Sequence, residues 1–382
     1  MKIAIVRSSL HRGSGQAVHI RELSKGLLKL GHEVHIFSRS IEDETLRGIG
    51  HETKFTLDGV PFIRHFGFAA SIVRAVRDFD LVHTQYHPSI IAGNWLHKIR
   101  GLPHVFTYHG FAPIRFWNNP FQKLKMIDHR VGTYFSLRLG LDRIIAVSHF
   151  LKRELVRNYR IEEQLIEVIY NGVDLERFNP RADGRKVREM YGIGSDPLVM
   201  FIGRLTPYKG VQFLLQGIPG VLKEVPNAKF MFAGSSRFDA PRIGQYLSDA
   251  RVRKAAIFTG YVADRILPQL YASCDVFCYP SLWEGFGLTP AEAQAAGKPV
   301  VAFETCALPE VVENRTTGLL VRPRDWKEMA GAIVRLLRDA KLRHDMGRKA
   351  RARVQELFSW DEVALRTEAV YEQAIIEHRG HD

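Results

Sequence analysis

The feature that most constrains the fold of this chain is a regular alternation of short β-branched runs with helical stretches. Runs in the first half cover residues 2–6, 34–37, 81–83, 104–108, 143–147 and 166–169. A second set covers residues 198–202, 229–233, 256–258, 276–279, 299–303 and 318–321. Helical stretches such as residues 17–30 separate most of them. This alternation predicts an α/β fold, with parallel sheets covered by helices on both faces.

The length of the chain divides this pattern into two domains. A single hydrophobic core stops growing beyond about 250–300 residues, and the chain has 382. The polar segment 179–188 separates the two sets of strands. We therefore expect two doubly wound, Rossmann-like domains, residues 1–172 and 173–360, with ligands bound where strand ends and loops converge.

Composition and charge exclude several classes of protein. The chain is 46% hydrophobic and 25% charged, as in an ordinary soluble protein, and its formal charge is +13. The sequence contains no basic run interleaved with aromatic residues, so it does not predict nucleic-acid binding. The apolar runs are too short to predict a membrane-spanning helix. The apolar run after Met1 is also too short for the core of a signal peptide. Cys274, Cys278 and Cys306 are expected to be buried thiols in a reducing cytoplasmic compartment.

The loop after the first predicted strand contains Gly13 and Gly15 and leads into a helix. Glycines at such a place let backbone N–H groups approach a phosphate, although they can also serve only a tight turn. The third glycine of a dinucleotide fingerprint is replaced by Val18, and the second strand ends at Ser38 and Arg39 without an acidic ribose ligand. The pattern therefore argues against an NAD-dependent dehydrogenase.

A second loop, residues 203–210, carries two cations between glycines. Gly203 and Arg204 follow a predicted strand, and Lys209 and Gly210 close the loop. A guanidinium fork and an ammonium group at this spacing suit a diphosphate. The alternative is a solvated turn.

The most specific segment covers residues 279–292. Pro290 indicates a helix start, and Thr289 and Glu292 have the spacing of a capping box, which gives Glu292 a structural alternative. Glu284 has no such role, and its carboxylate could accept protons from two sugar hydroxyls. The amides of residues 286–288 are expected to point at an anion.

These residues resemble retaining glycosyltransferases with the GT-B fold, and the chain resembles glycosyltransferase family four over nearly its whole length. Glu284 and Glu292 match the family's E-x7-E motif. Residues 203–210, 171–174 and 309–321 match further family segments in the same order. The resemblance implies two Rossmann-like domains around an inter-domain cleft, with a C-terminal helix, residues 361–382, packed back on the first domain.

The resemblance also implies a role for each matched residue. Arg204 and Lys209 would neutralise the donor diphosphate, Glu284 would hold hydroxyls of the transferred sugar, and His109 would touch that sugar. Further donor contacts are implied for Gly15, Gly203, Tyr261, Val262, Phe286, Gly287, Leu288 and Glu292. Three segments depart from the family pattern, and the last two put the identity of the donor in doubt: Gly13-Ser14-Gly15, Gly234-Ser235-Ser236 and Cys306-Ala307-Leu308.

No metal or other cofactor is expected in the reaction, because Arg204, Lys209 and the amides can stabilise the leaving group without Mg²⁺. Asp78 and Asp80 resemble a metal-binding Asp-x-Asp motif, but they precede a strand and are interpreted as a turn. The spacing of His83, His87, His104 and His109 fits no standard ligand set, so neutral imidazoles at strand ends are expected.

The expected activity is transfer of a hexose, mannose or glucose in type, from a GDP- or UDP-linked donor to a glycan, lipid-linked or small-molecule hydroxyl. The alternatives are a sugar-nucleotide epimerase or a glycan phosphorylase of the same fold, or a non-catalytic nucleotide-sugar-binding protein. Nothing suggests the lysine-bound pyridoxal phosphate that a phosphorylase needs.

Residues 121–139 are expected to form a helix in the acceptor-side domain. Phe121, Leu124, Val131 and Phe135 lie along one side. Lys123, Lys125, Arg130 and Arg138 surround that side, with Asp128 as the one acidic residue. One interpretation packs the apolar side on the domain's own sheet. The other docks the helix on the anionic inner face of a membrane as a peripheral contact.

Overall fold

The computed structural model describes residues 1–11, 13–53, 63–235 and 243–380. These divide into two compact units. The first contains residues 1–111, 124–172 and 360–382, and the second contains residues 112–123 and 173–359. The C-terminal helix belongs to the first unit, whereas residues 112–123 cluster with the second, which a division at residue 172 does not predict.

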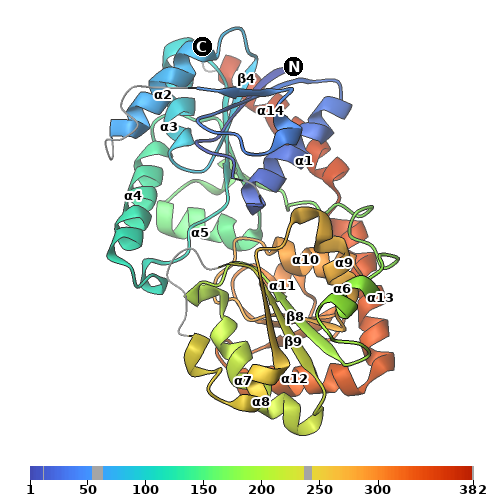
Figure 1. Ribbon diagram of the computed structural model, residues 1–382. Coiled ribbons are helices and arrows are strands. Elements are labelled where there is room, and N and C mark those ends of the chain that lie inside the picture. Colours follow the sequence, from blue (N-terminus) through green and yellow to red (C-terminus); the bar gives the residue numbers. More distant parts are fainter. Residues whose placement is uncertain (12, 54–62, 236–242, 381–382) are drawn as a thin grey trace. The chain divides into compact units, whose positions relative to one another are not determined.

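The first unit is built on a parallel sheet with the strand order β3-β2-β1-β4-β5-β6-β7 (Figure 1). Its strands are β1 (Lys2–Val6), β2 (Glu33–Ser38), β3 (Gly50–Glu52), β4 (Leu81–Gln85), β5 (His104–Tyr108), β6 (Arg143–Ala146) and β7 (Ile166–Val168). Its helices are α1 (Gly15–Lys29), α2 (Ile63–Ala75), α3 (Ser89–Arg100), α4 (Pro120–Ser136), α5 (His149–Tyr159) and α14 (Trp360–Gly380). The first residues of α4 cluster with the second unit.

Alternate residues of these strands face two separate cores. Ile3 and Ile5 pack on one face of the sheet with Leu23 of α1 and Tyr371 of α14. Neighbouring strand residues pack on the other face against apolar residues of α2 and α3. A sheet covered on both faces is the doubly wound arrangement that the sequence predicts.

The second unit repeats this design with the strand order β10-β9-β8-β11-β12-β13. Its strands are β8 (Leu198–Ile202), β9 (Lys229–Ala233), β10 (Ala256–Gly260), β11 (Val276–Tyr279), β12 (Val300–Phe303) and β13 (Gly318–Val321). Its helices are α6 (Arg185–Met190), α7 (Val211–Glu224), α8 (Ala250–Ala255), α9 (Leu267–Ser273), α10 (Leu288–Ala295), α11 (Leu308–Val311), α12 (Trp326–Arg338) and α13 (Ala340–Leu357). Every strand pair in both sheets is parallel, so the predicted α/β class is confirmed.

Candidate functional site

The loop after β8 presents the two predicted cations differently. Arg204 is exposed, and its guanidinium donates a hydrogen bond to the Tyr208 hydroxyl at 2.7 Å. A short 3₁₀ turn, Pro207–Lys209, then carries Lys209 inwards and ends at Gly210. Gly210 has φ +74°, and a Cβ there would lie 1.7 Å from the Pro280 carbonyl oxygen. Only glycine allows this approach, which places Lys209 beside the loop that follows β11.

Lys209 and Glu284, which are 75 positions apart in the sequence, form an ion pair in that place. The ammonium group lies 2.5 Å from the Glu284 carboxylate and donates to the Tyr279 hydroxyl at 2.7 Å. The two charged side chains are only 13% and 10% exposed. In the structure, the predicted phosphate cation and the predicted sugar carboxylate therefore neutralise each other.

Burial lowers the pKa of Lys209, but the adjacent Glu284 carboxylate and the Tyr279 and Tyr208 phenols raise it by more. The net pKa lies above the usual lysine value, so the side chain stays charged at neutral pH. Burial raises the pKa of Tyr279, and that phenol stays protonated. The phenol can therefore both accept from Lys209 and donate to a further group.

Helix α10 begins differently from the sequence prediction. Its N-cap is Gly287, with φ +115° and no side-chain cap, so the expected capping box of Thr289 and Glu292 is wrong. Pro290 is the third residue of the helix and not the first. The first intrahelical hydrogen bond runs from the Ala291 N–H to the Gly287 carbonyl, so the amides of Leu288 and Thr289 precede it. The helix N-terminus thus offers backbone donors and a favourable dipole to an anion.

The other predicted donor contacts of the second unit surround these loops. The Glu292 carboxylate accepts a hydrogen bond from the Tyr271 hydroxyl at 2.6 Å. Phe286 is buried against Phe358, with ring centroids 5.2 Å apart, so its side chain serves packing. Tyr261 is exposed and Val262 half-buried just beyond β10. Sequence reasoning missed the tyrosines at positions 208, 271 and 279, because a single aromatic residue in a turn, a helix or a strand carries no distinctive spacing.

Two of the segments that depart from the family pattern support the same loops. A Cβ at Gly234 would lie 1.9 Å from the Gly203 carbonyl oxygen, so a glycine is required there as well. Ser236 lies outside the described residues. Cys306 adopts φ +53° and is half-buried, so the prediction of three buried thiols is wrong at this position. The next residue, Ala307, donates its amide to the Glu284 carbonyl at 3.4 Å.

In the first unit, Gly15 and His109 lie at carboxyl-end loops of the sheet. Gly15 is exposed at the first position of α1, which Ser14 caps by accepting from the Ala17 amide. His109 Nε2 lies 3.0 Å from the Gln85 amide oxygen, and its ring packs edge-on against His19 at 4.9 Å. Burial, together with nearby His19 and Arg7, holds the pKa of His109 well below the usual value, so the imidazole is neutral.

A buried polar group around His109 was missed by sequence reasoning. His19 Nδ1 lies 2.8 Å from the Asn171 side-chain oxygen, and burial lowers the pKa of His19 to about 4. Arg7 lies over the Tyr86 ring at 4.6 Å, and burial lowers its pKa to about 10. These residues come from strand ends and helix α1, which only the fold brings together.

The interpretation of Asp78 and Asp80 as a structural turn is confirmed. Asp80 accepts a hydrogen bond from the Lys2 amide at 2.7 Å, at the start of β1, and Asp78 has φ +57°. This is the amino end of the sheet, away from the carboxyl-end loops. His83 and His104 also fit the prediction, since burial keeps the pKa of each low and each has hydrogen-bond partners.

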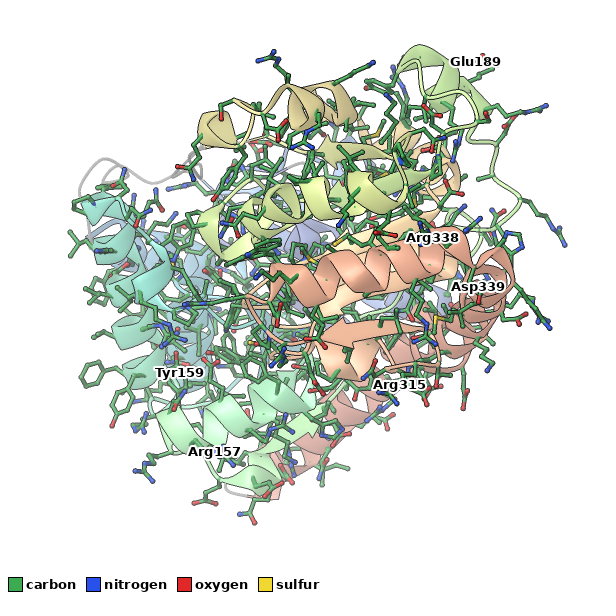
Figure 2. All side chains as sticks on the ribbon, turned by 90° about the horizontal axis from the view of Figure 1, so that it is seen from below. Arg157, Tyr159, Glu189, Arg315, Arg338 and Asp339 are labelled. Atoms are coloured by element: carbon green, nitrogen blue, oxygen red, sulfur yellow. The ribbon has the colours of Figure 1, made fainter. Side chains whose placement is uncertain are left out.

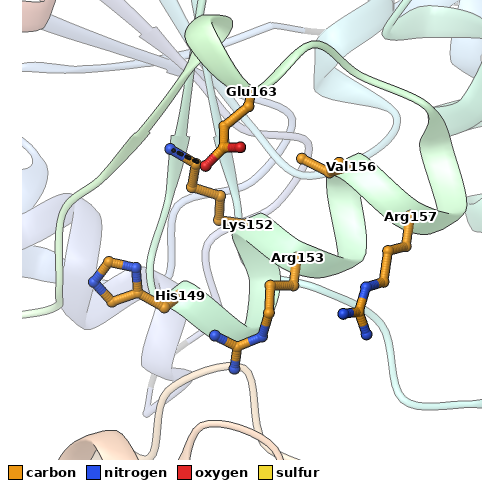
Figure 3. A pocket seen from close by; sticks show the side chains of 6 residues that line it. All are labelled: His149, Lys152, Arg153, Val156, Arg157 and Glu163. Atoms are coloured by element: carbon orange, nitrogen blue, oxygen red, sulfur yellow. Dashed lines mark ion pairs between the residues drawn. The ribbon is translucent and has the colours of Figure 1, made fainter.

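A shallow basic pocket lies on α5, outside these loops (Figure 3). Lys152 forms an ion pair with Glu163 at 3.4 Å on one side of the helix. His149, Arg153 and Arg157 follow one another along the helix and complete the lining with Val156. Charged side chains on an open helix surface provide positive potential but no enclosed site.

Two units of parallel strands with helices on both faces, and paired charges at the strand ends of the second, define a glycosyltransferase of the GT-B class. Residues 13–177 match Glycosyltransferase Family 4, and residues 185–353 match Glycosyl transferases group 1. The chain belongs to glycosyltransferase family 4, as its motifs predict.

Similar proteins span the whole chain. It is 30% identical to a D-inositol 3-phosphate glycosyltransferase of Streptomyces avermitilis, over 99% of this chain and 88% of the relative. It is 29% identical to the MMP alpha-(1->4)-mannosyltransferase of Mycolicibacterium hassiacum, over 98% of each chain. The crystal structure of Anabaena HepE in complex with UDP-glucose superposes with a TM-score of 0.83 at 22% identity, over 97% of this chain and 99% of that one.

Proposed function

We propose that this glycosyltransferase moves a hexose, mannose or glucose in type, from a GDP- or UDP-linked donor to a hydroxyl of a glycan, a lipid-linked or a small-molecule acceptor, with retention of anomeric configuration. The observation that carries this proposal is the adjacency of Lys209 and Glu284. One loop pair thus holds a cation for a leaving diphosphate and a carboxylate for sugar hydroxyls. The mannosyltransferase relative and the UDP-glucose-bound neighbour support the choice of donors.

The chemistry follows from what each group can do. Breaking the anomeric C–O bond leaves negative charge on the diphosphate, which Lys209, Arg204 and the α10 amides stabilise. The Glu284 carboxylate accepts hydrogen bonds from hydroxyls of the sugar and orients it. Because Lys209 holds the Glu284 carboxylate, we assign this carboxylate to positioning and not to nucleophilic attack. Retention then follows from attack by the acceptor hydroxyl on the face that the diphosphate leaves, with a phosphate oxygen taking its proton.

A donor screen tests the proposal. Thermal shift against GDP- and UDP-sugars should identify a stabilising donor, because a ligand at 100 times its Kd adds about 2.7 kcal/mol to the free energy of unfolding. The donor is then incubated alone and with candidate acceptors. Consumption that requires an acceptor supports transfer. Conversion of the donor alone identifies an epimerase, and binding without turnover identifies a nucleotide-sugar-binding protein.

Turnover is expected to persist in EDTA. Arg204, Lys209 and the backbone amides supply the positive charge that a divalent ion supplies elsewhere. The measurement is kcat before and after chelation, at a temperature well below the unfolding transition. Abolition of turnover by EDTA with recovery in Mg²⁺ or Mn²⁺ would contradict this expectation.

Helix α4 supports peripheral contact with a membrane, because its apolar side faces outward and its more polar side faces the rest of the domain. The exposed side carries Leu124, Ile127, Val131, Tyr134 and Phe135, of which Phe135 is 60% exposed. The buried side carries polar residues, Gln122, His129, Thr133 and Ser136, together with Met126. The interpretation that packs the predicted apolar side on the domain's own sheet is therefore wrong.

The groove between α4 and α5 extends this apolar surface. Val131, Tyr134 and Phe135 line it from α4, and Tyr159, labelled in Figure 2, lines it from α5. Lys123 and Lys125 remain exposed on α4. The other two predicted basic residues differ: Arg130 is half-buried and donates to the Phe111 carbonyl, while Arg138 donates to the carbonyls of Tyr134 and Tyr159.

We propose that this surface docks a cytosolic protein on an anionic bilayer. Apolar side chains entering the interface supply most of the affinity, and each basic residue adds about 1 kcal/mol. No helix in the described part of the chain is both long and apolar enough to cross a membrane.

Liposome flotation tests this contact. Binding to anionic vesicles is expected to exceed binding to neutral ones, to weaken only partly with salt, and to be lost when Leu124, Val131 and Phe135 are changed to Ser. Leu365→Ser with Ile376→Ser is a control, because these apolar side chains are also exposed but lie on α14. Equal loss in the control, or full recovery of the α4 variant on vesicles, would favour a soluble acceptor and no docking.

A further inference from the structure

Beneath α4, three elements of the first unit bring nitrogen and oxygen ligands together. His65 comes from α2, His87 follows β4, and Asp128 comes from α4. The ligand atoms of these three side chains all lie within 4.8 Å of one another. His129, the next residue on α4, packs edge-on against His87 with ring centroids 5.4 Å apart. His65 and His87 are more than nine-tenths buried.

His87 has an unusual environment for a buried imidazole. Its side chain is 1% exposed, yet neither ring nitrogen has a hydrogen-bond partner among the described residues. The Nδ1 atom of His129 is also without a partner there. A buried polar group without a partner is costly, so native proteins seldom leave one unexplained.

The backbone of α4 is shaped around this ring. A Cβ at Gly132 would lie 2.1 Å from Cε1 of His87. The imidazole therefore lies directly on the helix backbone and cannot turn away from His65 and Asp128 without moving α4. Packing fixes the ring in a place where no group in the described part of the chain hydrogen-bonds its nitrogens.

A second cluster of similar composition shows the contrast. His97, Asp142 and His378 also lie within 4.8 Å of one another. There, His378 Nδ1 lies 3.0 Å from Asp142 and Nε2 lies 3.0 Å from the Gly101 carbonyl oxygen. Asp142 also accepts from the His104 amide at 2.6 Å. In this cluster His97 Nδ1 lies 3.3 Å from the Asp142 carboxylate, and Asp142 and His378 both have hydrogen-bond partners. At the other site neither ring nitrogen of His87 has a hydrogen-bond partner among the described residues, and the closest approach of His65 to Asp128 is 3.8 Å, beyond a hydrogen bond.

We propose that His65, His87 and Asp128 form a Zn²⁺ site that fastens α2 and α4 to the loop after β4. Two neutral imidazoles and one carboxylate are a donor set that Zn²⁺ accepts in tetrahedral geometry, with water in the fourth position. Bonds of about 2 Å place tetrahedral ligand atoms about 3.3 Å apart, so the side chains draw together by roughly an ångström on loading. The site is independent of the proposed transfer reaction.

Metal binding by the purified full chain tests the site. After removal of metal by EDTA, equilibrium dialysis against Zn²⁺ is expected to give one ion per chain, and Co²⁺ is expected to give the visible bands of tetrahedral coordination. Asp128→Asn and His87→Ala should each weaken binding by at least about tenfold, since even loss of an outer partner costs that much. Asp128→Asn preserves side-chain volume, so it decides the question if His87→Ala fails to fold.

His378→Ala is the matched control, because it removes from the second cluster a histidine whose two nitrogens already have protein partners, and it should retain the ion. Zn²⁺ should also raise the Tm of the unaltered chain but not that of Asp128→Asn, while kcat far below Tm stays the same. Wild-type binding no stronger than that of Asp128→Asn, or loss of the ion in His378→Ala alone, would overturn the proposal.

Discussion

Changing Lys209 to Met is expected to lower kcat by about 10²–10³-fold, the usual effect of losing one group that stabilises charge in the transition state. Lys209 is the buried cation of the donor loops and lies 2.5 Å from Glu284. Glu284→Gln is expected to do comparable damage, because the single amide oxygen cannot accept hydrogen bonds from two sugar hydroxyls and from Lys209 as the carboxylate can. Arg204→Ala should also fall in this range. Steady-state kinetics with the donor identified in the screen provides the measurement.

Substitutions at both residues of the Lys209–Glu284 ion pair can separate effects on the free energy of unfolding from effects on kcat. Each single change leaves one buried charge without its partner, which costs up to about 3 kcal/mol at a site that is still slightly exposed. The double variant Lys209→Met with Glu284→Gln removes both charges and should regain most of that free energy of unfolding, while its kcat stays low. Recovery of turnover together with stability, or near-wild-type turnover in any single variant, would refute these assignments.

Gly210→Ala is expected to destabilise the second domain by about 2–5 kcal/mol. The left-handed backbone accounts for about 1–2 kcal/mol and the forced repacking for about 1–3 kcal/mol. A Cβ would lie 1.7 Å from the Pro280 carbonyl oxygen, so the loops that carry Lys209 and Glu284 would have to separate. Urea unfolding and donor binding should therefore change together.

Gly192→Ala isolates the backbone contribution. This glycine also has positive φ, at +62°, but nothing lies within 4 Å of its added Cβ. Its loss of stability should be limited to about 1–2 kcal/mol, with donor binding unchanged. Equal effects of the two substitutions would mean that the contact with Pro280 does not hold the loops together.

Strands could be predicted from the sequence where an apolar run has clear limits. Residues 198–202, 229–233 and 276–279 match β8, β9 and β11, because buried parallel strands are continuously apolar and end at glycine or proline. Strand β3 was missed. It is a three-residue edge strand, Gly50–Glu52, with two exposed polar side chains and no hydrophobic pattern.

The arrangement of side chains was less predictable. Helical periodicity in residues 121–139 gave the helix α4 but not which of its sides is buried, because both sides contain polar and apolar residues. The motifs predicted Lys209 and Glu284 as two donor-binding residues but not their contact with each other, because no local sequence pattern indicates a contact between positions so far apart. The side chains grouped with His87, those of His65 and Asp128, come from helices α2 and α4, so the spacing of His87 from the neighbouring histidines in the sequence is uninformative.

The neutral histidines of the first domain have a further consequence for proton uptake. Burial lowers the pKa of His19 and His104 to about 4, whereas an unfolded histidine titrates near about 6.5. When the pH falls from the higher of these values towards the lower, these histidines bind protons in the unfolded chain but not in the folded chain. Each such ring then lowers the free energy of unfolding by about 1.4 kcal/mol per pH unit. Acid is therefore expected to destabilise the first domain through these buried rings.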